Sequence, residues 1–223
     1  YQADAAEIMT ARARAFAALS KQATGASLRP AVRPDGIVQK AMARKQERVR
    51  GAICQDADIQ GETVGYVPGR ISGCGIQDAV RVRAVSGISL SQQAVMDCTT
   101  AKALKRWVDD GMKPAVGGFG GGVKEIRVAA HYACRTRNNQ PGAKIREHGK
   151  GRAIDISGFR LRDGGEITLL QGWNRRDTGA ILRKMHQRAC GIFGTVLGPE
   201  SNRFHLDHFH FDTARYRSGS YCR

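Results

Sequence analysis

The sequence of 223 residues has no long apolar run and few aromatic side chains. No stretch approaches the roughly 18 to 20 consecutive apolar residues that cross a bilayer, which argues against a membrane-spanning helix. The first ten residues, YQADAAEIMT, lack the charged and then apolar layout of a signal peptide. Because Tyr1 stands where an initiator Met would be, we interpret the chain as a processed or trimmed form.

Acidic residues are also scarce: 20 Asp and Glu stand against 36 Lys and Arg, a formal net charge of +16. This surplus predicts a polyanionic neighbour, and from charge alone nucleic acid and an envelope polymer are equally compatible. The sequence contains no zinc finger, RNP signature or basic helix with heptads. A glycine-rich stretch, AVGGFGGGV (115–123), lacks the Gly-Lys-Ser/Thr ending of a phosphate loop, so it carries little weight for nucleotide binding.

The cysteines form no C-x-x-C pair. There are six of them, at positions 54, 74, 98, 134, 190 and 222. An even number at wide spacing predicts a disulfide framework and an oxidising compartment. Fifteen pairings are possible, and we favour neighbours: 54 with 74, 98 with 134, and 190 with 222. Six buried free thiols in a cytosolic protein are the alternative.

The hydrophobic periodicity predicts an α+β domain over residues 51–223, preceded by a helical and basic extension over residues 1–50. The extension comprises an amphipathic helix (1–22), a linker (23–37) and a basic helix or tail (40–50). Within the domain we expect strands at 78–85, 124–130, 152–159, 166–170, 191–197 and 208–212, and helices at 97–110 and 178–189, the second capped by Asp177 or Thr178. The strands cluster in the C-terminal half, which favours a central antiparallel sheet flanked by helices.

Three of the six histidines lie within residues 205–212, HLDHFHFD. If residues 208–212 form a strand, two of these histidines and Asp212 point to one face, and the two phenylalanines point to the other. The phenylalanines would pack into the core while the histidines line an open face, with His205 just upstream. A single histidine here would more often be structural, but three together favour a site, because imidazoles at i and i+2 can converge on a metal ion.

A second cluster, EHGKGRAID (147–155), offers further ligands. His148 and Asp155 are separated by a turn with two glycines, through which both side chains could aim at one point. Two histidines and a carboxylate, with one position open for water, are a recognised catalytic zinc composition. The alternative for Asp155 is an ion pair with one of the many arginines. Its pairing with a downstream H-x-H favours zinc.

These residues resemble a known family. His148, Gly151, Ala153 and Asp155 resemble the H-x-x-G-x-A-x-D motif of the D-alanyl-D-alanine peptidase and lysostaphin superfamily of zinc peptidases. The downstream histidines are similar to the H-x-x-H-x-H of its penicillin-insensitive murein endopeptidase branch. With YACRTRN (132–138), VLGPES (196–201) and the cysteines, the ordered blocks resemble the bacterial extensin-like C-terminal domain family over roughly residues 50–222.

The resemblance implies a zinc-dependent peptidoglycan hydrolase, an endopeptidase that cleaves peptide cross-links of the LD or DD type. Its site residues would be the Zn²⁺ ligands His148, Asp155 and His210, the general base or transition-state stabiliser His208 with His205 assisting, and Arg135 or its rival Arg137 on the substrate. The chain has Arg146 where many D-Ala-D-Ala peptidases have serine, and a histidine where they use glutamate. These departures argue against a simple dipeptidase specificity.

The resemblance also implies a periplasmic or secreted protein, peripheral to the bacterial envelope. We expect a monomer that acts on peptidoglycan cross-links and binds no nucleic acid. One alternative is a non-catalytic domain that retains the zinc site and only holds cell-wall or protein partners. The other is a nucleic-acid-binding protein with structural histidines. Because ligand histidines must be neutral, zinc affinity and activity should fall below about pH 6.5.

Overall fold

The computed structural model describes residues 35–136, 144–215 and 218–223. The chain divides into two units, residues 1–43 and 44–223. Helix α2 (Asp35–Arg50) includes the basic segment 40–50 and exposes its described side chains to solvent. The helix expected at 1–22, and all of the expected linker except residues 35–37, lie outside the described residues. Among the helices that are described, none is long and apolar enough to cross a membrane.

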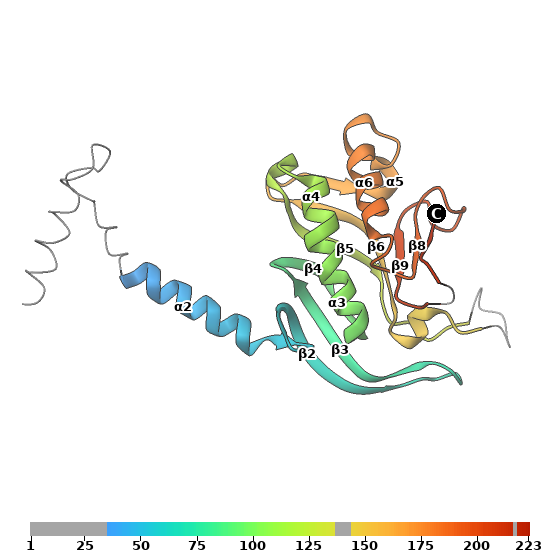
Figure 1. The fold of residues 1–223 in the computed structure, drawn as a ribbon, viewed down its shortest axis with the longest axis horizontal. Helices are drawn as coiled ribbons and strands as arrows, with labels where there is room; N and C mark the ends of the chain where they lie inside the picture. The colour runs from blue at the N-terminus through green and yellow to red at the C-terminus, as the bar shows by residue number, and fades with distance from the viewer. Residues whose placement is uncertain (1–34, 137–143, 216–217) are drawn as a thin grey trace, which may run out of the picture. The chain divides into compact units, whose positions relative to one another are not determined.

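The second unit is built on one large sheet with the strand order β1-β2-β3-β4-β5-β6-β9-β8-β10, and β7 pairs with β6 at its side (Figure 1). The strands are β1 (Ala52–Ile53), β2 (Asp56–Pro68), β3 (Gly75–Val85), β4 (Ile88–Asp97), β5 (Val123–Ala130), β6 (Ala153–Leu161), β7 (Glu166–Thr168), β8 (Thr195–Leu197), β9 (Phe209–Asp212) and β10 (Tyr221–Cys222). The predicted mixed α+β architecture with a large sheet is confirmed. The sheet is not purely antiparallel, because β4 pairs with β5 and β8 pairs with β10 in parallel.

The helical segments connect these strands. They are α3 (Cys98–Trp107), the π-helix η1 (Val108–Met112), α4 (Lys113–Val116), the short 3₁₀ turns η2 (Phe119–Gly121) and η4 (Glu147–Lys150), α5 (Leu169–Gly172) and α6 (Arg176–Ala189). Helix α3 begins where predicted because the Asp97 carboxylate accepts the Thr100 backbone N–H at 2.7 Å. The cap expected for α6 is wrong. That helix begins after Arg175, whose carbonyl accepts the Gly179 N–H, so Asp177 lies in its first turn.

The core lies between the sheet and the helices α3, α4 and α6, which cover one of its faces (Figure 1). Trp107 at the end of α3 is fully buried, and its indole N–H donates to the Met185 carbonyl of α6 at 2.9 Å. The ring of Phe211 on β9 meets Trp107 edge-on, with centroids 5.0 Å apart. The buried indole thereby joins both helices to the strand that carries the histidines.

Three disulfides bridge the second unit: Cys54–Cys98, Cys74–Cys134 and Cys190–Cys222. The disulfide framework and the third pair were predicted, but the pairing of 54 with 74 and of 98 with 134 is wrong. Strand β2 runs for 13 residues between positions 54 and 74, so these cysteines lie at opposite ends of a strand about 40 Å long. Cysteines close in sequence are therefore far apart in this hairpin.

Candidate metal centre

Strands β6 and β9 place one carboxylate and one imidazole side by side. They pair antiparallel, and Asp155 is the direct partner of His210. The alternation predicted for residues 208–212 is confirmed: Phe209 and Phe211 are fully buried in the core, and His210 lies on the opposite face of the strand. A side-chain pair in this register has its Cβ atoms about 5 Å apart.

The turn before β6 brings His148 to the same point. His148 lies in η4, which ends at Gly151 in the left-handed conformation with φ of 70°. Gly151 N–H donates to the His148 carbonyl at 3.1 Å. A Cβ at Gly151 would lie 2.3 Å from Ile76 Cδ1, so only glycine fits both the dihedral and the space. The predicted role of the glycine-containing turn is thus confirmed at Gly151.

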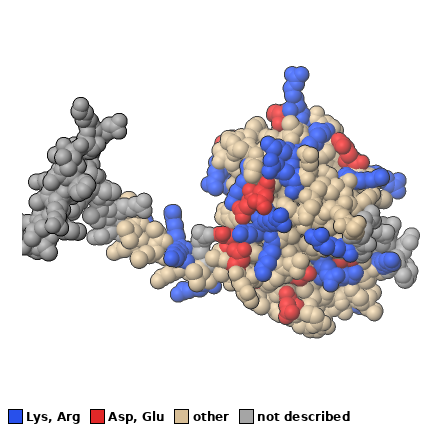
Figure 2. Space-filling model, in the orientation of Figure 1, with Lys and Arg blue, Asp and Glu red and all other residues tan. Residues whose placement is uncertain are grey.

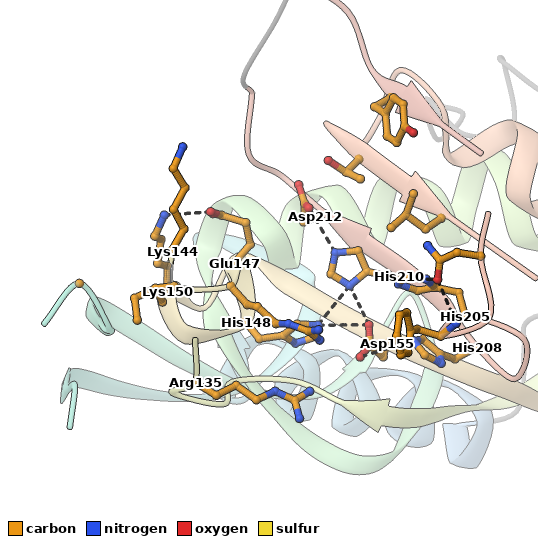
Figure 3. A pocket seen from close by; sticks show the side chains of 18 residues that line it. Arg135, Lys144, Glu147, His148, Lys150, Asp155, His205, His208, His210 and Asp212 are labelled. Atoms are coloured by element: carbon orange, nitrogen blue, oxygen red, sulfur yellow. Dashed lines mark hydrogen bonds and ion pairs between the residues drawn. The ribbon is translucent and has the colours of Figure 1, made fainter. Parts of the chain in front are cut away.

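Three ligand atoms converge at the centre of this arrangement (Figure 3). His148 Nε2 lies 3.2 Å from Asp155 Oδ1 and 3.1 Å from His210 Nδ1, and the last two atoms are 2.9 Å apart. Ligand bonds of 2.0–2.1 Å in a tetrahedron give edges of about 3.3 Å. The donor set and its spacing therefore fit a zinc ion, with room for a fourth ligand on the open side.

In His148 and His210, the ring nitrogen that points away from the cluster donates a hydrogen bond, as is usual for histidines that bind a metal. His148 Nδ1–H donates to the His131 carbonyl at 2.7 Å, and His210 Nε2–H donates to Asp212 Oδ2 at 3.2 Å. With a metal ion in the cluster, each bond would leave the other ring nitrogen as a lone pair directed at that ion, and such partners commonly orient metal-binding histidines. His131 and the role of Asp212 are absent from the sequence-based site, although the alternation in β9 already placed Asp212 on the histidine face.

The cluster is strongly coupled electrostatically. Burial would raise the pKa of Asp155, but the ring nitrogens of His148 and His210 beside the carboxylate outweigh it and hold that pKa well below its usual range. Burial would likewise lower the pKa of His210, yet hydrogen bonds to Asp155 and Asp212 raise it to about 9. Without a metal ion, His210 therefore binds a proton and supplies the positive charge of the cluster itself.

The other two histidines of HLDHFHFD lie beside the cluster. His208 Nε2 is 3.8 Å from Asp155 Oδ2, the oxygen that the triangle of ligand atoms does not use. The His205 ring lies behind it, with centroids 5.1 Å from His208 and 5.9 Å from His210. Burial, followed by the charges of His208 and His210, lowers the pKa of His205 to about 4. His205 is therefore neutral at physiological pH.

The cluster forms part of the wall of an open pocket of about 1190 Å³. Arg135 is exposed on its wall, and Figure 3 shows the side chain extending below His148 in the direction of Asp155. Its rival Arg137 lies outside the described residues. Lys144 and Lys150 also line the pocket, and Lys150 donates to the buried Glu147 at 2.9 Å. These three cations on the pocket wall favour an anionic ligand. Lys and Arg side chains are also spread over the visible face of the second unit (Figure 2).

Comparison with known proteins identifies one relationship. A family model described as extensin-like protein C-terminus matches residues 42–223. The match therefore spans the whole sheet, the three disulfides and every residue of the cluster. No curated protein and no solved structure matches the chain.

Proposed function

The chain belongs to the extensin-like protein C-terminus family, and on that premise we propose that it is a zinc-dependent endopeptidase that hydrolyses the peptide cross-links of peptidoglycan. The observation that supports this most directly is the convergence of His148 Nε2, Asp155 Oδ1 and His210 Nδ1 within 3.2 Å of one another on the wall of a pocket. Two imidazoles and one carboxylate are the ligand set of catalytic rather than structural zinc.

The ligands are preorganised for this task. Asp155 and His210 come from adjacent strands of a continuous sheet, and His148 is held by a turn whose glycine packs against Ile76. When bound, zinc would polarise a scissile carbonyl and lower the pKa of water towards about 7. The cluster faces the pocket, while Phe209 and Phe211 on the other face of β9 are buried in the core.

We assign the general base to His208. Its Nε2 lies 3.8 Å from Asp155 Oδ2, so a proton acceptor lies immediately beside the ligand cluster. His205 is placed one ring further away and assists. Arg135 is the cation on the pocket wall that we assign to a substrate carboxylate or to the developing oxyanion.

The substrate class follows from the charge and size of the pocket. Stem peptides of peptidoglycan carry free carboxylates, which Arg135, Lys144 and Lys150 would attract. A pocket of about 1190 Å³ accommodates several residues of a cross-linked peptide. Three disulfides support an oxidising location, so we place the protein in the periplasm or outside the cell.

Digestion of purified sacculi tests the proposal. The zinc-loaded protein should release new muropeptides that mass spectrometry identifies as cleaved cross-links, and His210→Ala should release none. His186→Gln is the matched control, because His186 lies outside the cluster and bonds the Arg223 carbonyl instead. Zinc-loaded protein that sediments with sacculi but produces no new muropeptides would support the non-catalytic wall binder. A salt-sensitive DNA shift by protein that binds no zinc would support the nucleic-acid alternative.

A further inference from the structure

Two side chains of the loop between β8 and β9 accept hydrogen bonds from the histidines beside the cluster. Asn202 Oδ1 lies 2.8 Å from His205 Nδ1, and Asp207 Oδ1 lies 2.7 Å from His208 Nδ1. Asp207 bonds the ring nitrogen of His208 that is not the one facing Asp155. The arrangement repeats what the His131 carbonyl and Asp212 do for the two ligand histidines.

The orientation of Asn202 is settled by a second bond. Its Oδ1 also accepts the Phe204 backbone N–H at 2.9 Å, and a backbone N–H can only donate. The atom facing His205 is therefore the amide oxygen and not the amide nitrogen. Since that oxygen is an acceptor, His205 Nδ1 must carry the hydrogen, and Nε2 of the neutral ring holds the lone pair.

Asp207 leads to the same conclusion for His208. An ionised carboxylate only accepts hydrogen bonds, so at 2.7 Å the hydrogen belongs to His208 Nδ1. The remaining nitrogen, Nε2, is the one that lies 3.8 Å from Asp155 Oδ2 at the edge of the cluster. The lone pair thus faces the pocket.

The loop that carries both acceptors is itself anchored. Glu200 Oε1 accepts the Trp173 indole N–H at 3.1 Å, and Ser201 Oγ donates to the Gly198 carbonyl at 2.7 Å. The His205 backbone N–H donates to the Asn202 carbonyl at 3.1 Å. These bonds hold the loop from Gly198 to His205, and Asn202 lies within that stretch.

We propose that Asn202 and Asp207 are positioning residues that hold His205 and His208 in the Nδ1–H tautomer, so that both rings present Nε2 to the pocket as proton acceptors. The alternative is that the lone pairs of His205 and His208 bind a second metal ion. Within the described parts of the chain, however, the grouping that can hold a metal is His148, Asp155 and His210. The tautomer assignment stands on geometry, and its consequence for turnover rests on the proposed function.

Ring-nitrogen NMR tests the assignment without reference to activity. In the full chain labelled with ¹⁵N-histidine and loaded with zinc, long-range ¹H–¹⁵N correlation at pH 7.5 should show His205 and His208 protonated on Nδ1 and unprotonated on Nε2. Single histidine substitutions assign the signals. In Asp207→Ala the His208 signals should move to a mixture of both tautomers. In Asn202→Ala the same should happen to His205, and Asn202→Asp, which keeps the acceptor oxygen, should restore the Nδ1–H form.

Kinetics on soluble cross-linked muropeptides tests the consequence. Asp207→Ala should lower kcat by about 10- to 100-fold, with KM changed less than about twofold and zinc content unchanged, because outer hydrogen-bond partners have effects of that size. Leu206→Ala is the matched control in the same loop, since the Leu206 side chain is exposed and the change touches neither acceptor. It should retain kcat, KM and both histidine tautomers.

Two results would overturn the proposal: wild-type spectra with Nε2–H on His205 or His208, or an Asp207→Ala variant whose spectra and kcat equal those of the wild type. Failure of the proposed function gives a different pattern. A wild-type protein that cleaves no cross-link but shows both Nδ1–H tautomers refutes the peptidase and leaves the positioning role of Asn202 and Asp207 intact.

Discussion

Zinc binding to the metal-free protein should release one proton from His210. Hydrogen bonds to Asp155 and Asp212 raise the pKa of this histidine to about 9 in the absence of metal. At pH 7.5 a group with that pKa is protonated in roughly 97% of molecules. The proton occupies Nδ1, the atom that lies 3.1 Å from His148 Nε2 and 2.9 Å from Asp155 Oδ1. Because a cation in the cluster needs that lone pair, proton and metal compete for one position.

The size of this competition follows from the pKa. Each pH unit below about 9 weakens zinc binding by about 1.4 kcal/mol, so at pH 7.5 the loss is about 2 kcal/mol, or about 30-fold in Kd. Affinity should therefore already decline from about pH 9 downward. An ordinary histidine pKa would place that onset near pH 6.5, as the sequence predicts, and the two carboxylates around His210 account for the difference.

Isothermal titration calorimetry in buffers of different ionisation enthalpy measures the proton count directly. The apparent enthalpy of zinc binding at pH 7.5 should vary with buffer by a slope of about one proton. Asp212→Asn removes one charge that raises the His210 pKa, so its slope should be smaller and its pH dependence should begin at lower pH. A slope of zero for the wild type would refute the reasoning, since it would mean that zinc does not displace a proton from His210 Nδ1.

Three further predictions concern stability and the framework of the site. The raised His210 pKa stabilises the metal-free fold fully below pH 6.5, and this contribution of about 3 kcal/mol should be lost as pH rises through about 9; urea unfolding that shows no decline between pH 6.5 and 10 would contradict it. Gly151→Ala should destabilise by about 1 kcal/mol for its dihedral and a further 1 to 3 kcal/mol for the contact with Ile76, and should weaken zinc binding. Gly191→Ala, at φ of 86° with open space around it, should show the dihedral cost alone, and equal losses in both variants would disprove the packing argument. Replacing Cys74 and Cys134 by serine opens a loop of 60 residues and should cost about 4 kcal/mol in guanidinium unfolding, whereas a loss below 1 kcal/mol would show that the loop is already ordered in the unfolded state.

Strands whose apolar residues alternate could be predicted from the sequence, and strands without that alternation could not. Residues 78–85 and 124–130 alternate cleanly, and they lie in β3 and β5. Strand β2 was missed because it contains two glycines and only one of its 13 residues is buried, so its apolar residues do not keep a period of two. Strand β4 was missed as well, because its exposed run SQQ interrupts the alternation of buried and exposed residues.

The disulfide pairing shows a different limit. Sequence proximity is a poor guide where a long strand separates two cysteines, as β2 does for Cys54 and Cys74. It succeeded for Cys190 and Cys222, where the strand of the second cysteine, β10, pairs with β8 just after the first. Which cysteines pair depends on which strands become neighbours, and the order of the strands is a property of the whole sheet.

The same distinction explains how much of the candidate site could be found. Side chains on the open face of one strand obey a local period, so His208, His210 and Asp212 could be grouped from residues 208–212 alone. That Asp155 pairs directly with His210 is a matter of register between strands 55 residues apart, which the residue types suggested and only the fold specifies. The partner of His148 Nδ1 is the backbone carbonyl of His131. Every residue has a backbone carbonyl, so the residue types cannot identify this partner. The nitrogen that each histidine offers depends on such partners, so a list of histidines predicts where a metal can bind but not which ring atom binds it.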